Sequence, residues 1–221
     1  MKNYKLKFNT WGRKQYDIYR HRIQNISLKW CLQIIQILKK QKIFKKKVTI
    51  KDLGSNYFQF YKEIKLKKLN NNVDYFGYES EKKYVELGLK FFPELKKKYK
   101  IVNIENCKLI NTDISICSAT LEHTLNPGKI LNKIIKTTND IIIIRSFVGN
   151  KNLKKIYFTK KNDGYLIRQF TRKFFTEKFS KSNFKTTFHL DLATNKRFNY
   201  INNSKSFKRK FHIIVAVKKS I

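Results

Sequence analysis

The chain alternates short apolar runs with segments in which apolar residues recur every three or four positions. A β-branched run at 48–53 and an aromatic-rich run at 73–78 predict strands, and the amphipathic segments at 58–69 and 81–92 that follow them predict helices. Continuous apolar strands alternating with amphipathic helices are typical of a parallel sheet covered on both faces. We therefore expect an α/β fold.

The same alternation continues into the second half, where a helix is predicted at 129–137. Strands 184–190 and 211–217 are joined without a clear helix and are expected to form an antiparallel edge pair. The other predicted strands cover 101–104, 113–117 and 140–145.

Residues 11–44 predict one amphipathic N-terminal helix. Its apolar face includes Ile23, Ile26, Trp30, Ile34 and Leu38, at steps of three and four. Such a face needs a partner, so the helix should pack on the following domain. We expect a helical arm at 1–45 and an α/β domain at 46–221.

Positive charge dominates the composition, with 50 Lys and Arg against 15 Asp and Glu and a net charge of +35. A basic surface of this size attracts polyanions such as RNA or DNA. However, the chain is rich in residues encoded by A/T-rich codons, and its lysines are scattered. The aromatic and basic segment 170–179 fits either a covering helix or a base-stacking surface. A nucleic-acid partner therefore stays an alternative.

Cysteine spacing and hydropathy indicate a cytoplasmic protein. The three cysteines are widely spaced and form no zinc-type cluster with histidine, which favours buried reduced thiols. No apolar run approaches the ~20 residues of a membrane helix, and no apolar leader follows Met1. We expect no membrane span, and the sequence indicates no particular oligomeric state.

The first predicted strand, turn and helix occupy the place where open α/β sheets bind phosphate or adenosine ligands. Asp52 ends the strand, and Gly54 lets the backbone approach a ligand. Glu79 ends the second predicted strand, where two carboxylate oxygens match the cis-diol of a ribose. This order of residues predicts a nucleoside site.

Three segments resemble motifs of the class I S-adenosylmethionine-dependent methyltransferases. They are the glycine motif Asp52–Phe58, the acid motif Tyr75–Glu79, and Asp113–Pro127, which contains the Leu-Glu-His triplet of small-molecule methyltransferases. The similarity covers roughly 48–148. It implies a Rossmann-like, seven-stranded, mostly parallel sheet with helices on both faces, an antiparallel last strand, and S-adenosylmethionine as cofactor.

The resemblance also implies a site and a reaction. Methyl transfer to a small metabolite, lipid precursor or sugar is expected. His123 is a candidate general base, and a structural histidine that orders its loop is the alternative. Glu122 is a candidate for substrate contact or for ordering its loop. Arg145 is a candidate for binding an anionic substrate, and a solvated or paired arginine is the alternative. Ala119 stands where some relatives have a metal-binding acid, so no metal is expected. The predicted cofactor residues are Asp52, Gly54, Ser55, Asn56, Glu79, Asn103, Glu105 and Ser118.

Two positions depart from the family's pattern. Asn56 and Phe58 replace the second and third glycines of the first motif. Asn tolerates a left-handed backbone, but a ring at position 58 must point away or narrow the cofactor site. The link from Ile104 to Asp113 is also short, so we expect a loop instead of the usual helix. An RNA methyltransferase and a non-catalytic relative remain the alternatives.

Overall fold

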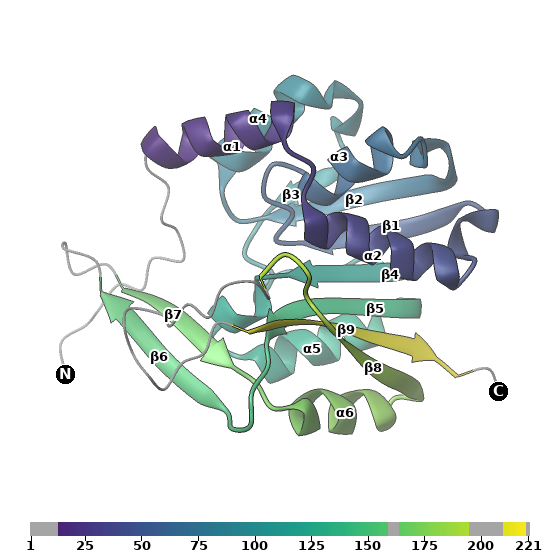
Figure 1. The fold of residues 1–221 in the computed structure, drawn as a ribbon, viewed down its shortest axis with the longest axis vertical. Helices are drawn as coiled ribbons and strands as arrows, with labels where there is room; N and C mark the ends of the chain where they lie inside the picture. The colour runs from purple at the N-terminus through teal and green to yellow at the C-terminus, as the bar shows by residue number, and fades with distance from the viewer. Residues whose placement is uncertain (1–12, 159–163, 195–209, 220–221) are drawn as a thin grey trace.

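The computed structural model describes residues 13–158, 164–194 and 210–219. A seven-stranded sheet, in the order β3-β2-β1-β4-β5-β9-β8, forms the middle layer (Figure 1). Its strands are β1 (Val48–Leu53), β2 (Val73–Glu79), β3 (Tyr99–Ile101), β4 (Thr112–Ser118), β5 (Thr138–Phe147), β8 (Phe184–Leu190) and β9 (Phe211–Lys218). The α-helices are α1 (Arg13–Asn25), α2 (Lys29–Lys40), α3 (Gln59–Leu66), α4 (Lys82–Phe91), α5 (Pro127–Lys136) and α6 (Arg172–Ser180).

The strand directions confirm the predicted fold class. Neighbouring strands from β3 to β5 run parallel, whereas β9 pairs antiparallel with both β5 and β8. The last strand therefore lies inside the sheet, between β5 and the edge strand β8. The fold is a Rossmann-like α/β sheet in which the carboxyl ends of β1, β2 and β4 meet at one edge.

Two apolar clusters explain the layers, because alternate residues of each strand face opposite sides. On one face, Ile143 and Ile213 pack with side chains of α2, α3 and α4. On the other face, Ile142 and Ile144 pack with side chains of α5 and α6. The five helices bury both faces of the sheet, which is why its central strands are apolar throughout.

The N-terminal arm is two helices, so the expectation of a single helix over 11–44 was wrong. The break falls at 26–28, and Ile26 is exposed. Buried Lys62 donates from Nζ to the carbonyl oxygens of Arg22 and Ile26, at 2.7 and 2.8 Å. Buried Glu63 accepts the N–H of Leu28 at 3.1 Å. These two side chains of α3 satisfy the backbone groups that the break releases.

The third strand begins and ends earlier than the predicted 101–104. The side chain of Asn103 accepts the N–H of Glu105 at 2.9 Å, a local bond that favours a turn over a strand. The segment from here to β4 is a loop, as expected. The predicted covering helix within 170–179 is confirmed as α6.

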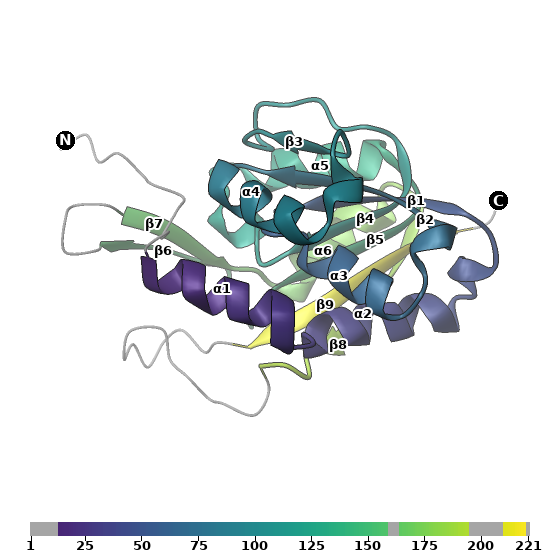
Figure 2. The ribbon, with the colours of Figure 1, turned by 90° about the horizontal axis from the view of Figure 1, so that it is seen from above.

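An antiparallel hairpin, β6 (Leu153–Phe158) and β7 (Gly164–Gln169), was not predicted. In both views it lies at the same end of the molecule as α1 (Figures 1 and 2). Across the described ranges, no helix has the length and apolar character needed to cross a membrane.

Candidate functional site

A cavity of about 340 Å³ opens at the carboxyl ends of β1, β2 and β4. The turn after β1, the end of β2, the loop after β3 and the segment after β4 form its walls, and α1 contributes Tyr19 and Arg22. This is the position at which open α/β sheets bind ligands. The predicted site residues that line it are Gly54, Asn56, Glu79, Asn103, Glu105, Ser118 and His123.

Gly54 shapes the floor of the cavity. Its φ is +78°, and a Cβ placed on it would lie 2.0 Å from Oγ1 of Thr120. The N–H groups of Gly54 and Ser55 both donate to the carbonyl oxygen of Tyr78, at 2.8 and 3.0 Å. A residue with a side chain would therefore push the turn and Thr120 apart.

Asn56 and Phe58 keep the left-handed backbone expected at glycine positions, with φ values of +54° and +63°. The Asn56 side chain accepts the N–H of Tyr57 at 2.9 Å, a local bond of the kind that makes Asn tolerant of this region. The path of the turn is thus preserved although two of its three motif glycines are replaced.

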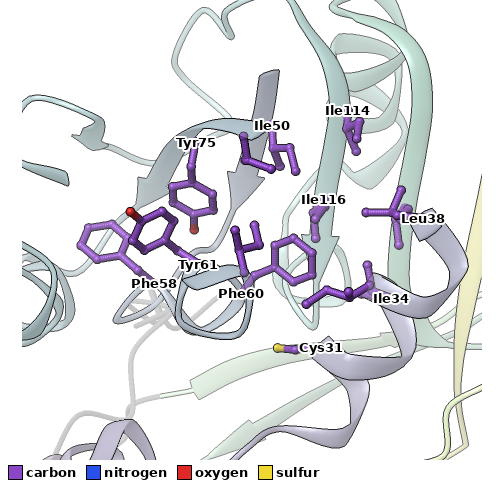
Figure 3. Close-up of a cluster of buried hydrophobic side chains, with 14 of the residues drawn as sticks. Cys31, Ile34, Leu38, Ile50, Phe58, Phe60, Tyr61, Tyr75, Ile114 and Ile116 are labelled. Atoms are coloured by element: carbon purple, nitrogen blue, oxygen red, sulfur yellow. The ribbon is translucent and has the colours of Figure 1, made fainter. Parts of the chain in front are cut away.

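The ring of Phe58 points away from the cavity and into the core. It is fully buried beside Tyr75 and Tyr99, with ring centroids 6.3 and 6.2 Å apart, and Figure 3 shows it against Tyr75. The space for it comes from Gly77 and Gly88, because a Cβ at either position would lie within 3.0 Å of the ring. The ring does not line the cavity, so it does not narrow the predicted cofactor site.

Glu79 faces the turn across the cavity wall. Its Oε2 accepts the N–H of Asn56 at 2.8 Å, and its Oε1 accepts the N–H groups of Ser80 and Glu81 at 2.8 and 3.1 Å. Burial raises the pKa of the Glu79 carboxyl, and these backbone donors work against that shift. Oε1 is more heavily bonded than Oε2, so Oε2 has the larger remaining capacity to accept a ligand hydroxyl.

Asp52 lies beneath the turn and outside the cavity lining. Its Oδ2 accepts the hydroxyl of Tyr75 at 2.6 Å, and burial raises the carboxyl pKa to about 7. Ser55 is also buried and outside the lining. Asp52 therefore lies behind the predicted cofactor contacts, whereas Ser55 is part of the turn itself and has a buried Oγ without a hydrogen-bond partner among the described residues.

Ser118 ends β4 at the cavity wall, and its buried Oγ has no hydrogen-bond partner among the described residues. Buried polar groups are normally paired, so this oxygen has unused hydrogen-bonding capacity at the cavity wall. Glu105 also lines the cavity, but its Oε1 accepts the N–H groups of Leu125 and Asn126 and thereby holds the loop before α5. Of the two, Ser118 has the freer side chain.

His123 and Glu122 occupy a short 3-10 turn, Leu121–His123, and point in different directions. His123 lines the cavity, and its Nδ1 lies 2.7 Å from the carbonyl oxygen of Leu166 in β7. A carbonyl oxygen only accepts, so Nδ1 carries the proton and a neutral ring has its lone pair on Nε2. The hairpin that the sequence analysis missed therefore orients this histidine.

Glu122 is fully buried outside the cavity and accepts the hydroxyl of Ser146 at 2.9 Å. Burial raises its pKa. Arg168 of β7 donates to the carbonyl oxygens of Thr124 and Leu125, at 3.2 and 2.9 Å, and fastens the same segment from outside. Two roles were considered for Glu122. Its buried position fits the ordering of the loop, and the side chain does not reach the cavity where a substrate would bind.

Arg145 also lies outside the cavity lining. Its Nε and Nη2 both donate to Oδ2 of buried Asp191, at 3.1 and 2.8 Å. The guanidinium carbon lies 5.3 Å from the ring centroid of Trp30 and 4.2 Å from that of Phe211. The predicted substrate-binding arginine is instead enclosed in an ion pair, which leaves it no free face for an anionic substrate.

Sequence reasoning missed the residues that α1 and α4 bring to the cavity. Tyr19 of α1 packs against Tyr57 and Tyr84, with ring centroids 5.4 and 5.3 Å apart. Arg22 lies over the Tyr19 ring at 5.6 Å. The sequence signal was the run of aromatic and basic residues before Ile23, but only the packing shows that α1 reaches this wall.

The charge of the cavity differs from that of the chain. Its described lining contains the carboxylates of Glu79, Glu81 and Glu105, against Arg22 and His123. Within the described residues, no three His, Cys, Asp or Glu side chains gather as metal ligands do. The protein's large positive charge is therefore located elsewhere on its surface.

No protein-family model and no curated protein sequence matches this chain. Solved structures do match. Magnesium protoporphyrin IX methyltransferase from Synechocystis PCC 6803 with bound S-adenosylmethionine is 13% identical over 96% of this chain and 86% of that one, with a TM-score of 0.59. A 1,6-didemethyltoxoflavin-N1-methyltransferase from Burkholderia thailandensis, with bound 1,6-didemethyltoxoflavin and S-adenosylhomocysteine, is 12% identical over 94% and 87%, with a TM-score of 0.60. The cyclase SpnF is 11% identical over 86% and 81%, with a TM-score of 0.59.

These similarities establish the fold, which is that of the class I S-adenosylmethionine-dependent methyltransferases. One matched structure is named for a cyclase, so the fold by itself does not fix the reaction.

Proposed function

We propose that this protein is an S-adenosylmethionine-dependent methyltransferase that acts on a small molecule such as a metabolite, a lipid precursor or a sugar. The observation that carries the proposal is the open cavity at the end of the first strand, with Gly54, Glu79 and Ser118 on its walls. Its volume of about 340 Å³ lies within the usual range for ligand sites.

The residues present fit the cofactor. A side chain at position 54 would collide with Thr120 in the cavity wall, and Oγ of Ser118 is a buried polar atom that lacks a described partner. Glu79 would accept a ribose hydroxyl at Oε2, and Ser118 would bond the nucleoside from the opposite wall. Asn103, on the loop after β3, would lie beside the base.

The bound cofactor supplies a sulfonium methyl group, whose carbon forms a bond to the acceptor while its bond to sulfur breaks, giving S-adenosylhomocysteine. The protein's contribution is to align the acceptor with that methyl group and to exclude water. Tyr19 and Arg22 of α1 close one side of the cavity and would hold the acceptor against it.

His123 is the proposed general base. The carbonyl oxygen of Leu166 holds the proton on Nδ1, so Nε2 would take the proton that an O–H or N–H acceptor loses. Glu122 is proposed only to order the turn that positions His123, because its carboxyl is buried on Ser146.

The charge of the lining favours a small acceptor over a nucleic acid. Carboxylates at positions 79, 81 and 105 would repel a phosphate backbone that approached the cavity. Phe58, the reason for considering a non-catalytic relative, packs in the core instead of in the site.

The three cysteines are unpaired, which supports the expected cytoplasmic location.

Calorimetric titration with S-adenosylhomocysteine tests the proposal. The wild-type protein is expected to bind, and Glu79→Gln is expected to weaken binding about tenfold, since a charge-assisted hydrogen bond is lost. Glu86→Gln is the matched control, because Glu86 is exposed on α4 and pairs with Lys82 outside the cavity. No binding at millimolar ligand, or equal loss in both variants, would overturn the proposal.

A further inference from the structure

A second cavity, of about 910 Å³, lies beyond the end of β5 and shares no lining residue with the first. The base of the β6–β7 hairpin, the start of α6 and the start of β9 line it; Figure 1 labels these elements. Its described lining residues are Val148, Gly149, Asn150, Lys151, Asn152, Leu153, Gln169, Thr171, Arg172, Lys173, Lys210 and His212.

The charge of this lining is of one sign. Lys151, Arg172, Lys173 and Lys210 face the cavity from three separate segments, and no acidic residue is among its described lining residues. Lys173 also pairs with Glu177 at 3.6 Å, and an anion in the cavity would reduce the repulsion among the other cations. The first cavity has the opposite balance, so the arrangement is not a consequence of overall composition.

A buried histidine supplies the second observation. His212 is only 5% exposed, lines the cavity, and has no hydrogen-bond partner for Nδ1 among the described residues. Burial lowers its pKa, and the neighbouring Arg172 and Lys210 lower it further. A backbone hydrogen bond with Lys210 and the charge of Asp191 act in the opposite direction, but the net shift of the pKa is downward.

Hydrogen bonds between the segments give the cavity a fixed shape. Nε2 of Gln169 donates to the carbonyl oxygen of Lys151 at 2.9 Å, and Oδ1 of Asn152 accepts the N–H of Thr171 at 2.9 Å. A Cβ on Gly149 would lie 2.2 Å from Nε2 of Gln169, so a larger residue there would displace this side chain from its bond to Lys151. These contacts join the hairpin base to the first turn of α6.

The start of α6 adds donors of the same kind. Thr171 caps the helix, and its hydroxyl accepts the N–H of Phe174 at 3.2 Å. The N–H groups of Arg172 and Lys173 follow in the first turn, where helix geometry provides no acceptor. A helix N-terminus also carries partial positive charge, which favours an anion.

We propose that this second cavity is an anion site that binds a phosphate-bearing small molecule, with Arg172 and Lys210 pairing with the phosphate and His212 donating from within the wall. Arginine suits such a ligand because its planar fork bonds two phosphate oxygens. The site is separate from the proposed methyl-transfer cavity and does not depend on that function.

The test is calorimetric titration of the full chain with sodium pyrophosphate at low ionic strength. The wild-type protein is expected to bind, and Arg172→Gln with Lys210→Gln is expected to weaken binding at least tenfold. Both side chains are exposed, so the double variant should fold. His212→Phe, which removes the buried donor and keeps a ring, is expected to weaken binding severalfold.

The matched control is Lys39→Gln with Lys40→Gln, which removes the same charge from exposed positions on α2. It should change the affinity by less than twofold. Equal loss in the two double variants, or no binding by the wild-type protein, would overturn the proposal. A short single-stranded oligonucleotide that bound while pyrophosphate did not would also overturn it, in favour of a nucleic-acid surface. Unchanged S-adenosylhomocysteine binding in these variants would separate this site from the first.

Discussion

Nδ1 of His123 lies 2.7 Å from the carbonyl oxygen of Leu166, so a residue of the β6–β7 hairpin fixes the orientation of a histidine that follows β4. Sequence inspection identified the histidine and not its partner, which is 43 positions away. The contact decides which ring nitrogen can act as a base.

The tautomer of His123 can be measured directly. At pH 8 the neutral ring is expected to carry its proton on Nδ1, because a carbonyl oxygen offers no proton to that nitrogen. Long-range ¹⁵N correlation spectra of the histidines, assigned by comparison with His123→Gln, would show it. His21, which is exposed on α1, provides a reference ring. A proton on Nε2 in the free protein would contradict the proposed role.

Gly88 should resist substitution although it lies inside a helix, where alanine is normally favoured by about 1 kcal/mol. A Cβ there would lie 2.5 Å from the Phe58 ring and 2.9 Å from the carbonyl oxygen of Tyr57. Gly88→Ala is therefore expected to lower the free energy of unfolding by about 2 kcal/mol, measured by urea denaturation.

The matched control for that variant is Gly128→Ala, because a Cβ at this position would have its nearest neighbour 3.7 Å away. It should leave the stability unchanged or raise it by up to about 1 kcal/mol, because alanine is the better helix former. Adding Phe58→Leu to Gly88→Ala should recover part of the lost unfolding free energy, since the smaller leucine side chain leaves room for the alanine Cβ. Additive losses in the double variant would show that the ring and Gly88 do not compete.

Asp52 should make the protein less stable as the pH rises. Burial raises its folded-state pKa from 3.8 to about 7, so the folded protein holds a proton that the unfolded chain has released. The stabilisation is complete below about pH 4 and is lost as the pH rises through 7. At about 1.4 kcal/mol per pH unit, this shift corresponds to on the order of 4 kcal/mol.

Asp52→Asn removes this dependence and still accepts the hydroxyl of Tyr75. The variant should gain stability relative to the wild type between pH 4.5 and pH 8.5, with both proteins measured by urea denaturation. A difference between the two proteins that stays constant across this range would mean that Asp52 is ionised in the fold.

We expect Arg145 to contribute to the stability of the fold and not to ligand binding. Replacing it with methionine leaves the buried carboxylate of Asp191 without its partner, so Arg145→Met is expected to cost about 3 to 5 kcal/mol in unfolding free energy. Adding Asp191→Asn should return part of that loss. S-adenosylhomocysteine affinity should stay within about twofold of the wild type in whatever fraction remains folded, because Arg145 lies outside the cavity lining. Little loss of stability in the single variant would argue against the ion pair.

The sequence by itself determined the α/β class, the succession of strands and helices along most of the chain, and which residues stand at the ends of the first two strands. Apolar periodicity fixes which residues face the core, and Gly54 and Glu79 follow directly from where β1 and β2 end. These features are local, because they depend on residues within a few positions of one another.

The tertiary structure alone decided the rest. The break between α1 and α2 is stabilised by Lys62 and Glu63. The ring of Phe58 lies in the core because Gly77 and Gly88 leave space for it. Arg145 looked like a ligand-binding residue until Asp191, 46 positions later, was found against it. In each case, the position of a side chain depends on which distant residue fills a buried space or pairs with a buried charge. The periodicity of apolar residues along the chain gives no information about such distant contacts.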